Sequence, residues 1–342
     1  MVAGPPATAR GVVYHDVNGN GARDPGEPGV RGVRVSNGRE IVTTDGRGAY
    51  TLPVDDDTCL FVLKPRNWTP PMDANGLARF YYIHKPAGSP RLRYAGVEPT
   101  GPLPASVDFP LTPRREPNRF KALVFGDTQP RNQTEIIYIA QDVVKELIGA
   151  DAAFGITLGD VVFDDIALFD SIKRTIGTIG LPWVYVMGNH DTNQDAPDVA
   201  RSDETWERHF GPPYYSFDYG PVHFVVLDNI MWRARTATAS AGYSAGLGEK
   251  QLEWLRNDLN AVPKKQLVVL LMHIPFEAVA EKEQIFRLIE GRPNTFSMSA
   301  HTHTQEHRFI GKEAGWNGKT PRLRKLVVGR SGRTGHTPRD HE

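Results

Sequence analysis

Five short motifs along the chain supply carboxylate, amide and imidazole side chains, each directly after an apolar run typical of a β-strand. In order they read Gly126-Asp127-Thr128-Gln129, Gly159-Asp160, Gly188-Asn189-His190-Asp191, Met272-His273 and His301-Thr302-His303. Side chains of these types bind divalent metals, and a pair of metals can activate water against a phosphoryl group. One such motif alone is more often a turn or a structural histidine, but five in this order predict a two-metal centre.

The spacing of these residues suggests how they would share two metals. Asp160 is the natural bridging carboxylate, because one Asp can give an oxygen to each of two metals about 3.5–4 Å apart. Asn189 offers a neutral carbonyl oxygen. His301 and His303 alternate, so on an extended segment they would point the same way and each could bind a metal.

Composition limits the class of protein. The chain has 342 residues, which favours about two domains, and its formal net charge is zero. No basic stretch interleaves with aromatic residues, so we expect no nucleic-acid surface, and no apolar run of about twenty residues could span a membrane. Cys59 is the one cysteine, which excludes an intramolecular disulfide and a cysteine-cluster metal site.

Residues 1–112 and residues 120–320 differ in pattern. The first part has short β-type runs between Gly, Asp and Asn turns, which predicts a small antiparallel β-sandwich, with a linker at 113–119. In the second part strands alternate with helical stripes, which predicts sheets covered by helices on both sides. We expect strands at 120–125, 154–158, 183–187, 214–217, 223–227, 267–272, 295–299 and 308–310, and helices at 135–148, 166–176, 202–210, 249–259 and 281–289.

The five motifs together resemble those of the calcineurin-like metallophosphoesterase superfamily and, distantly, the purple acid phosphatases. The resemblance implies an α+β or α/β chain with a four-layer α/β/β/α sandwich after the small β-sandwich. It also implies two divalent metals (manganese, iron, zinc or magnesium). It assigns the metal ligands as follows: Asp127, Asp160 and His303 to one metal, and Asp160, Asn189, His273 and His301 to the other. Gln129 stands where the family commonly has His, which predicts a harder, weaker first site that favours manganese, magnesium or iron over zinc.

The same resemblance places His190 beside the phosphate as general acid or transition-state stabiliser, with Asp191 orienting its ring. Phe163 stands where purple acid phosphatases carry a metal-binding Tyr, so no violet colour is expected. Asp164 and Asp165 are read either as supporting groups or as an additional ligand. Five other features are interpreted without a direct role in the chemistry: His209 and His223 as structural, Asn193 and Asp195 as lining the substrate mouth, and residues 232–243 as a mobile flap.

Residues 16–27 fit a twelve-residue calcium loop, with oxygen ligands at Asp16, Asn18, Asn20, Asp24 and Glu27. A plain Asn- and Gly-rich turn is the alternative. The segment and its surroundings resemble the SdrD-B-like and transthyretin-like sandwiches that precede some bacterial metallophosphoesterases. That pairing is typical of exported proteins, so we expect a periplasmic or secreted protein whose signal peptide is absent from this chain.

The function predicted from these residues is hydrolysis of a small phosphorylated substrate, a phosphomonoester or a phosphodiester. Two alternatives stay open: a pyrophosphatase acting on nucleotide-diphosphate compounds, and a secreted binding protein with a degenerate centre whose sandwich anchors it to cell-envelope glycan. The sequence does not predict the oligomeric state. Residues 321–342 predict an irregular basic tail, either a truncated domain or an altered reading frame, with poor order after about residue 330.

Overall fold

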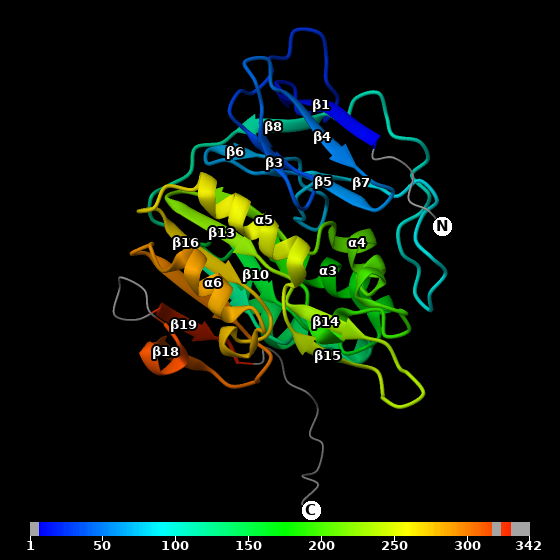
Figure 1. Cartoon of the computed structure of the whole chain (residues 1–342), viewed down its shortest axis with the longest axis vertical. Coiled ribbons are helices and arrows are strands. Elements are labelled where there is room, and N and C mark those ends of the chain that lie inside the picture. The colour runs from blue at the N-terminus through cyan, green and yellow to red at the C-terminus, as the bar shows by residue number, and fades with distance from the viewer. Residues whose placement is uncertain (1–6, 317–322, 330–342) are drawn as a thin grey trace, which may run out of the picture.

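The computed structural model describes residues 7–316 and 323–329, and it has a small β-sandwich packed on a larger α/β part (Figure 1). One sheet of the sandwich has the order β4-β1-β8-β6 and the other β3-β2-β5-β7. Their strands are β1 (Ala7–His15), β2 (Arg34–Ser36), β3 (Ile41–Thr43), β4 (Ala49–Val54), β5 (Thr58–Leu63), β6 (Trp68–Thr69), β7 (Tyr81–His84) and β8 (Phe109–Pro113). Alternate residues of each sheet, such as Leu52 and Val62, are buried in one shared core.

Two further sheets form the centre of the larger part. A parallel sheet of order β11-β10-β9 faces a mixed sheet of order β12-β13-β16-β17-β19-β18. Their strands are β9 (Ala122–Phe125), β10 (Phe154–Leu158), β11 (Trp183–Val186), β12 (Tyr215–Tyr219), β13 (Val222–Val226), β16 (Leu267–Leu271), β17 (Thr295–Ser299), β18 (Glu306–Ile310) and β19 (Leu323–Val327). Ile156 and Leu158 of β10 share one apolar core with Val269 and Leu271 of β16, so the two sheets pack face to face.

Helices cover the outer face of each sheet. Ile139 and Ile172 share a core with Trp183, whereas Trp254 and Phe286 share another with Leu270. The helices on the three-stranded sheet are α1 (Gln133–Ile139), which continues through the π-helical turn η1 (Ala140–Val144) into α2 (Lys145–Leu147), then α3 (Phe169–Gly177) and α4 (Glu204–Phe210). Those on the six-stranded sheet are α5 (Gly248–Ala261) and α6 (Lys282–Ile289), drawn in front of it in Figure 1. The predicted four-layer α/β/β/α fold after a β-sandwich is therefore confirmed.

Short elements complete the fold. They are the 3-10 turns η2 (Ile166–Leu168), η3 (Asn189–Asp191), η4 (Val199–Arg201), η5 (Phe276–Ala278) and η6 (Lys312–Ala314), and the antiparallel hairpin of β14 (Ile230–Arg233) and β15 (Gly242–Ala245). Residues 232–243, expected to be a mobile flap, are the loop of this hairpin, and both ends of the segment belong to its strands. No helix in the described ranges is long and apolar enough to cross a membrane.

The prediction of an irregular tail from residue 321 is wrong for part of it. β19 pairs with β17 in parallel and with β18 in antiparallel register, so residues 323–327 belong to the six-stranded sheet. Lys325 in this strand is buried and pairs with Glu277 at 2.8 Å. The expected poor order after residue 330 concerns residues outside the described ranges.

Buried polar contacts fix the sandwich against the larger part. Arg34 of β2 contacts Asp258 of α5 with 2.9 Å between Nη1 and Oδ1, and Asp258 has no exposed side-chain surface. Lys85, just after β7, pairs with Glu204 and Glu207 of α4. Because a buried charge that loses its partner is strongly destabilising, these pairs hold the two parts in one relative orientation.

Candidate metal centre

All five motifs meet at one edge of the facing sheets, just past the carboxyl ends of β9, β10, β11, β16 and β17. Asp127 follows β9, Asp160 follows β10 and Asn189 follows β11, and these three strands are parallel neighbours. His273 and His301 follow β16 and β17, which are parallel neighbours in the second sheet. Parallel strands end at the same edge of a sheet, which is why residues distant in sequence lie together here. The predicted placement of each motif after a strand is confirmed.

The backbone of this edge is held in an unusual conformation. Seven non-glycine residues of the described chain have positive φ, and six belong to this region. They are Asp127 (47°), Gln129 (38°), Asp160 (51°), Asp164 (59°), His301 (70°) and His303 (58°). Such backbone costs about 1–3 kcal/mol per residue and clusters at functional sites. The expectation that His301 and His303 lie on an extended segment is therefore wrong, although both side chains reach the centre.

Two motif glycines are required by close approach. A Cβ on Gly159 would lie 2.5 Å from Nδ1 of His273, and a Cβ on Gly188 would lie 2.1 Å from the backbone N of Asp160. Both distances are far below van der Waals contact, so no other residue type fits at either position without displacing a ligand.

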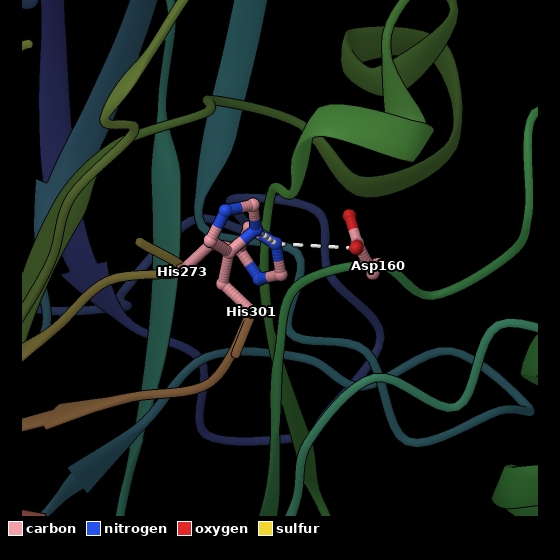
Figure 2. A group of neighbouring side chains, drawn as sticks. All are labelled: Asp160, His273 and His301. Carbon is pink, nitrogen blue, oxygen red and sulfur yellow. Dashed lines mark hydrogen bonds and ion pairs between the residues drawn. The ribbon is translucent and has the colours of Figure 1, made fainter. Parts of the chain in front are cut away.

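Asp160, His273 and His301 form the most compact group of donors (Figure 2). Their ligand atoms all lie within 4.8 Å of one another. His273 Nε2 is 3.2 Å from Asp160 Oδ2, 3.1 Å from Asn189 Oδ1 and 3.1 Å from His301 Nδ1. Two atoms that each bind an ion at about 2.1 Å lie about 3 Å apart when they subtend a right angle, so these spacings suit one divalent ion.

The protonation of His273 supports the same interpretation. Its Nδ1 lies 2.8 Å from the carbonyl oxygen of Leu158 and donates to it, so Nε2 is the atom that faces Asn189 and Asp160. Burial alone lowers the pKa of His273, but the Asp160 carboxylate more than offsets this and raises the pKa to about 9, so without a metal Nε2 carries a proton at pH 7. Burial, with the positive His273 beside it, lowers the pKa of His301 to about 4, so His301 is a neutral imidazole at pH 7. The Asp160 carboxylate therefore attracts positive charge to this group, and a metal ion bound there would take the place of the proton on His273 Nε2.

The second group of donors contains Asp127, Gln129 and His303. His303 Nε2 lies 3.6 Å from Asp127 Oδ1, and both Asp127 oxygens accept from the backbone N–H of His301. Gln129 lies 2.6 Å from Asp160 Oδ2 through Nε2, and its buried Oε1 has no hydrogen-bond partner among the described residues. An orphaned buried acceptor in a side chain that contacts a carboxylate fits a metal ligand, so Asp127, Gln129, Asp160 and His303 would suit a second divalent ion.

His190 stands at the side of this centre. Its backbone N–H donates to Asp160 Oδ1 at 3.0 Å, and its ring stacks on Phe163 with 4.3 Å between centroids. Its Nδ1 lies 2.6 Å from Asp164 Oδ1. The prediction that Asp191 orients this ring is wrong. Asp191 points into the protein from η3, with 0% exposure, and accepts from the backbone N–H groups of Gly188 and of the loop after Asp160.

Sequence comparison agrees with this geometry. Residues 120–305, more than half of the chain, match the profile described as "Calcineurin-like phosphoesterase". The chain belongs to the calcineurin-like phosphoesterase family. Residues 17–94 also match the profile "N terminal of Calcineurin-like phosphoesterase". As a member of this family the chain is a metal-dependent phosphoric ester hydrolase. A comparison with curated proteins finds no match.

Among solved structures, the chain is similar to several phosphatases. A dimetal phosphatase from Danio rerio is 16% identical over 63% of this chain and 89% of its own, with a TM-score of 0.45. PhoD is 12% identical over 96% of this chain and 76% of its own, with a TM-score of 0.47. The purple acid phosphatase PPD1 from yellow lupin seeds is 14% identical over 96% of this chain and 64% of its own, with a TM-score of 0.44.

One residue of this calcineurin-like phosphoesterase lies elsewhere than expected. Asn193 is fully buried and hydrogen-bonds Thr205, so it does not line a substrate mouth. Asp195 is exposed and accepts from the backbone N–H of Arg93, and its place at the mouth stays a prediction. His209 contacts Asp170, and His223 lies between Asp218 and Asp258, outside the centre, as expected for structural histidines.

Sequence reasoning missed three contacts of the phosphoesterase centre. They are the Leu158 carbonyl on His273, the ring of Phe163 on His190, and Tyr243 of β15, whose ring lies 6.0 Å from that of His301. Each contact joins residues more than 26 positions apart, so no local sequence pattern predicts it.

Proposed function

We propose that this centre hydrolyses a phosphate monoester or diester with the help of two divalent metals. The observation that carries the proposal is the convergence of seven donor residues, from five separate strand ends, on one edge of the sheets. Asp127, Gln129, Asp160 and His303 would hold one metal, and Asp160, Asn189, His273 and His301 the other. Bound metals lower the pKa of water and neutralise charge on the phosphoryl oxygens.

His190 acts on the substrate in this proposal. Because its Nδ1 is held by Asp164, its Nε2 is the nitrogen available to a phosphoryl oxygen or to the leaving group. The ring of Phe163 limits rotation of the imidazole by stacking on it. Asp164 and Phe163 are thus positioning residues, and His190 is the group that donates a proton to the departing oxygen.

Turnover of p-nitrophenyl phosphate and bis-p-nitrophenyl phosphate tests the proposal, with manganese, magnesium, iron and zinc supplied separately. We expect hydrolysis with at least one metal, and its loss in Asp160→Asn together with bound metal. His190→Ala should keep the metal but lower turnover by roughly a hundredfold. His307→Ala, an exposed histidine of β18, is the matched control and should behave as wild type. Absence of turnover with every metal refutes the enzymatic proposal and favours a binding protein.

We also propose that residues 16–27 bind calcium. Asp16 is 2% exposed, and its oxygens accept three backbone N–H groups of the turn. The side-chain amide N–H groups of Asn18 and Asn20 both donate to Asp24 Oδ2 at 2.8 Å, and the backbone N–H of Asp24 donates to Glu27, so these four oxygen-bearing side chains lie together. Calcium should raise the unfolding temperature of the wild type but not of Asp24→Ala. Equal melting of the wild type with and without calcium refutes the site.

We further propose that the protein is exported and that its sandwich binds cell-envelope glycan. These proposals rest on the sequence resemblance of the N-terminal part alone. Fractionation of producing cells tests the first, and co-sedimentation of the whole chain with purified cell-wall glycan tests the second. Recovery only with the cytoplasm, or no co-sedimentation, refutes the respective proposal.

A further inference from the structure

Arg131 and the catalytic histidine contact the same aromatic ring, and among the described residues no carboxylate pairs with the Arg131 guanidinium. The guanidinium carbon of Arg131 lies 4.7 Å from the ring centre of Phe163, the same ring that stacks on His190 at 4.3 Å. The guanidinium is therefore no farther from the imidazole than the sum of these two distances. Arg131 is exposed, so a ligand can reach its side chain from solvent.

The charge of Arg131 is not used within the described part of the chain. No carboxylate there forms an ion pair with its guanidinium, and the Glu135 carboxylate accepts a hydrogen bond from the backbone N–H of Arg131. The neighbouring Asp164 is occupied by the imidazole of His190 and by Gln194. An arginine held over an aromatic ring keeps its N–H groups free for a planar, two-point contact with a phosphate.

We propose that Arg131 binds a second phosphate of the substrate, next to the phosphoryl group held at the metals. This inference rests on the proposed metal-dependent hydrolysis, but it assigns the preferred substrate to the phosphoanhydrides, compounds in which the leaving group is itself a phosphate, in place of esters of alcohols. In the reaction, water forms the new P–O bond and the bridging P–O bond breaks. The bridging oxygen keeps the electron pair, and the released proton goes to solvent.

The position of Arg131 explains why a phosphate leaving group would be favoured. In this proposal His190 faces the departing oxygen, and the Arg131 guanidinium, which contacts the same Phe163 ring as His190, binds the phosphate on which negative charge grows as the bridging bond breaks. An alcohol leaving group has no second phosphate, so it would make no ionic contact with the Arg131 guanidinium. The selectivity should therefore come from Arg131 and not from the metal ligands.

AMP and ADP test this proposal, because they differ by one phosphate. We expect wild-type kcat/KM to be higher for ADP than for AMP. Arg131→Ala should lower the ratio of the two values by at least about tenfold, mainly through KM for ADP, because one hydrogen-bonded charge contact is worth about 1.5–3 kcal/mol. The ADP-to-AMP ratio of Arg131→Lys should lie between those of the wild type and Arg131→Ala, since lysine keeps the charge but loses the two-point contact.

Arg93→Ala is the matched control. Arg93 is also exposed and also lies over an aromatic ring, 5.0 Å from the centre of Tyr94, but that ring contacts Asp165 and not His190. An unchanged ADP-to-AMP ratio in Arg131→Ala, or an equal fall in Arg93→Ala, overturns the inference. If the wild type hydrolyses neither nucleotide nor p-nitrophenyl phosphate, the proposed hydrolysis itself is refuted. The two failures are therefore distinguishable.

Discussion

Replacing Asp164 by Asn tests whether this carboxylate, and not Asp191, supports His190. The contact between His190 Nδ1 and Asp164 Oδ1 is 2.6 Å, a charge-assisted distance. Hydrogen bonds to charged groups contribute about 1.5–3 kcal/mol. The two side chains are 24% and 41% exposed, so water screens them and the lower end applies. Since about 1.4 kcal/mol is tenfold in rate, Asp164→Asn should lower kcat about tenfold.

The assay distinguishes a loss of His190 positioning from a loss of bound metal. Turnover of p-nitrophenyl phosphate is measured beside the metal content of the same sample, because Asp164 is not among the proposed ligands and its variant should keep both ions. Asp165→Asn is the control, since the adjacent carboxylate contacts Tyr94 and not His190. If Asp164→Asn retains wild-type kcat, or if it loses metal in step with activity, the positioning role assigned to Asp164 is wrong.

Three further predictions concern metal choice, packing and pH. Gln129→His should raise affinity for zinc relative to manganese by about tenfold or more in a metal titration, since imidazole is the softer ligand; an unchanged ratio contradicts the ligand role of Gln129. Gly159→Ala, at φ +87°, should destabilise the protein by about 2 kcal/mol or more in urea and lower its metal content, because the new Cβ meets the His273 ring; wild-type stability contradicts this. For His223, burial lowers the pKa, but Asp258 and Asp218 more than offset this and raise it to about 9. This group therefore stabilises the fold fully below about pH 6.5, and up to about 3 kcal/mol is lost as pH rises through 9. Urea midpoints should fall across that window in the wild type and much less in His223→Gln; equal pH slopes contradict the assignment.

The strands around the centre could be predicted because each one is an apolar run that ends at a motif. The run that ends at Leu158 is buried at every position between two layers, so its sequence is continuously apolar apart from Thr157. The run before His273 alternates between two cores, with Val268 facing the helices and Val269 facing the other sheet. Local sequence thus determines where each ligand stands along a strand.

Other features depend on contacts between distant residues and could not be predicted. The ladder partner of Lys325 is Ser297 of β17, and nothing near residue 325 in the sequence indicates this pairing. The path of the chain after Asp160 brings Asp164 to His190, whereas the G-N-H-D pattern alone suggested the adjacent Asp191. A sequence pattern states which groups are present, but the loop conformation decides which of them touch.

The two proposed metal positions differ in a way that the ligand types alone do not show. His273 is fully buried, with its tautomer fixed by a backbone carbonyl, so the position that it shares with Asn189 is rigid before any ion binds. The side chain of His303 is 44% exposed, and Gln129 offers an orphaned amide oxygen, so the other position is open to solvent and weaker in its donors. Ligands that are fixed in advance lose less freedom on binding, and imidazole binds first-row metals more strongly than an amide does. We therefore expect the position built from Gln129 and His303 to be the one whose occupancy depends on which metal is available.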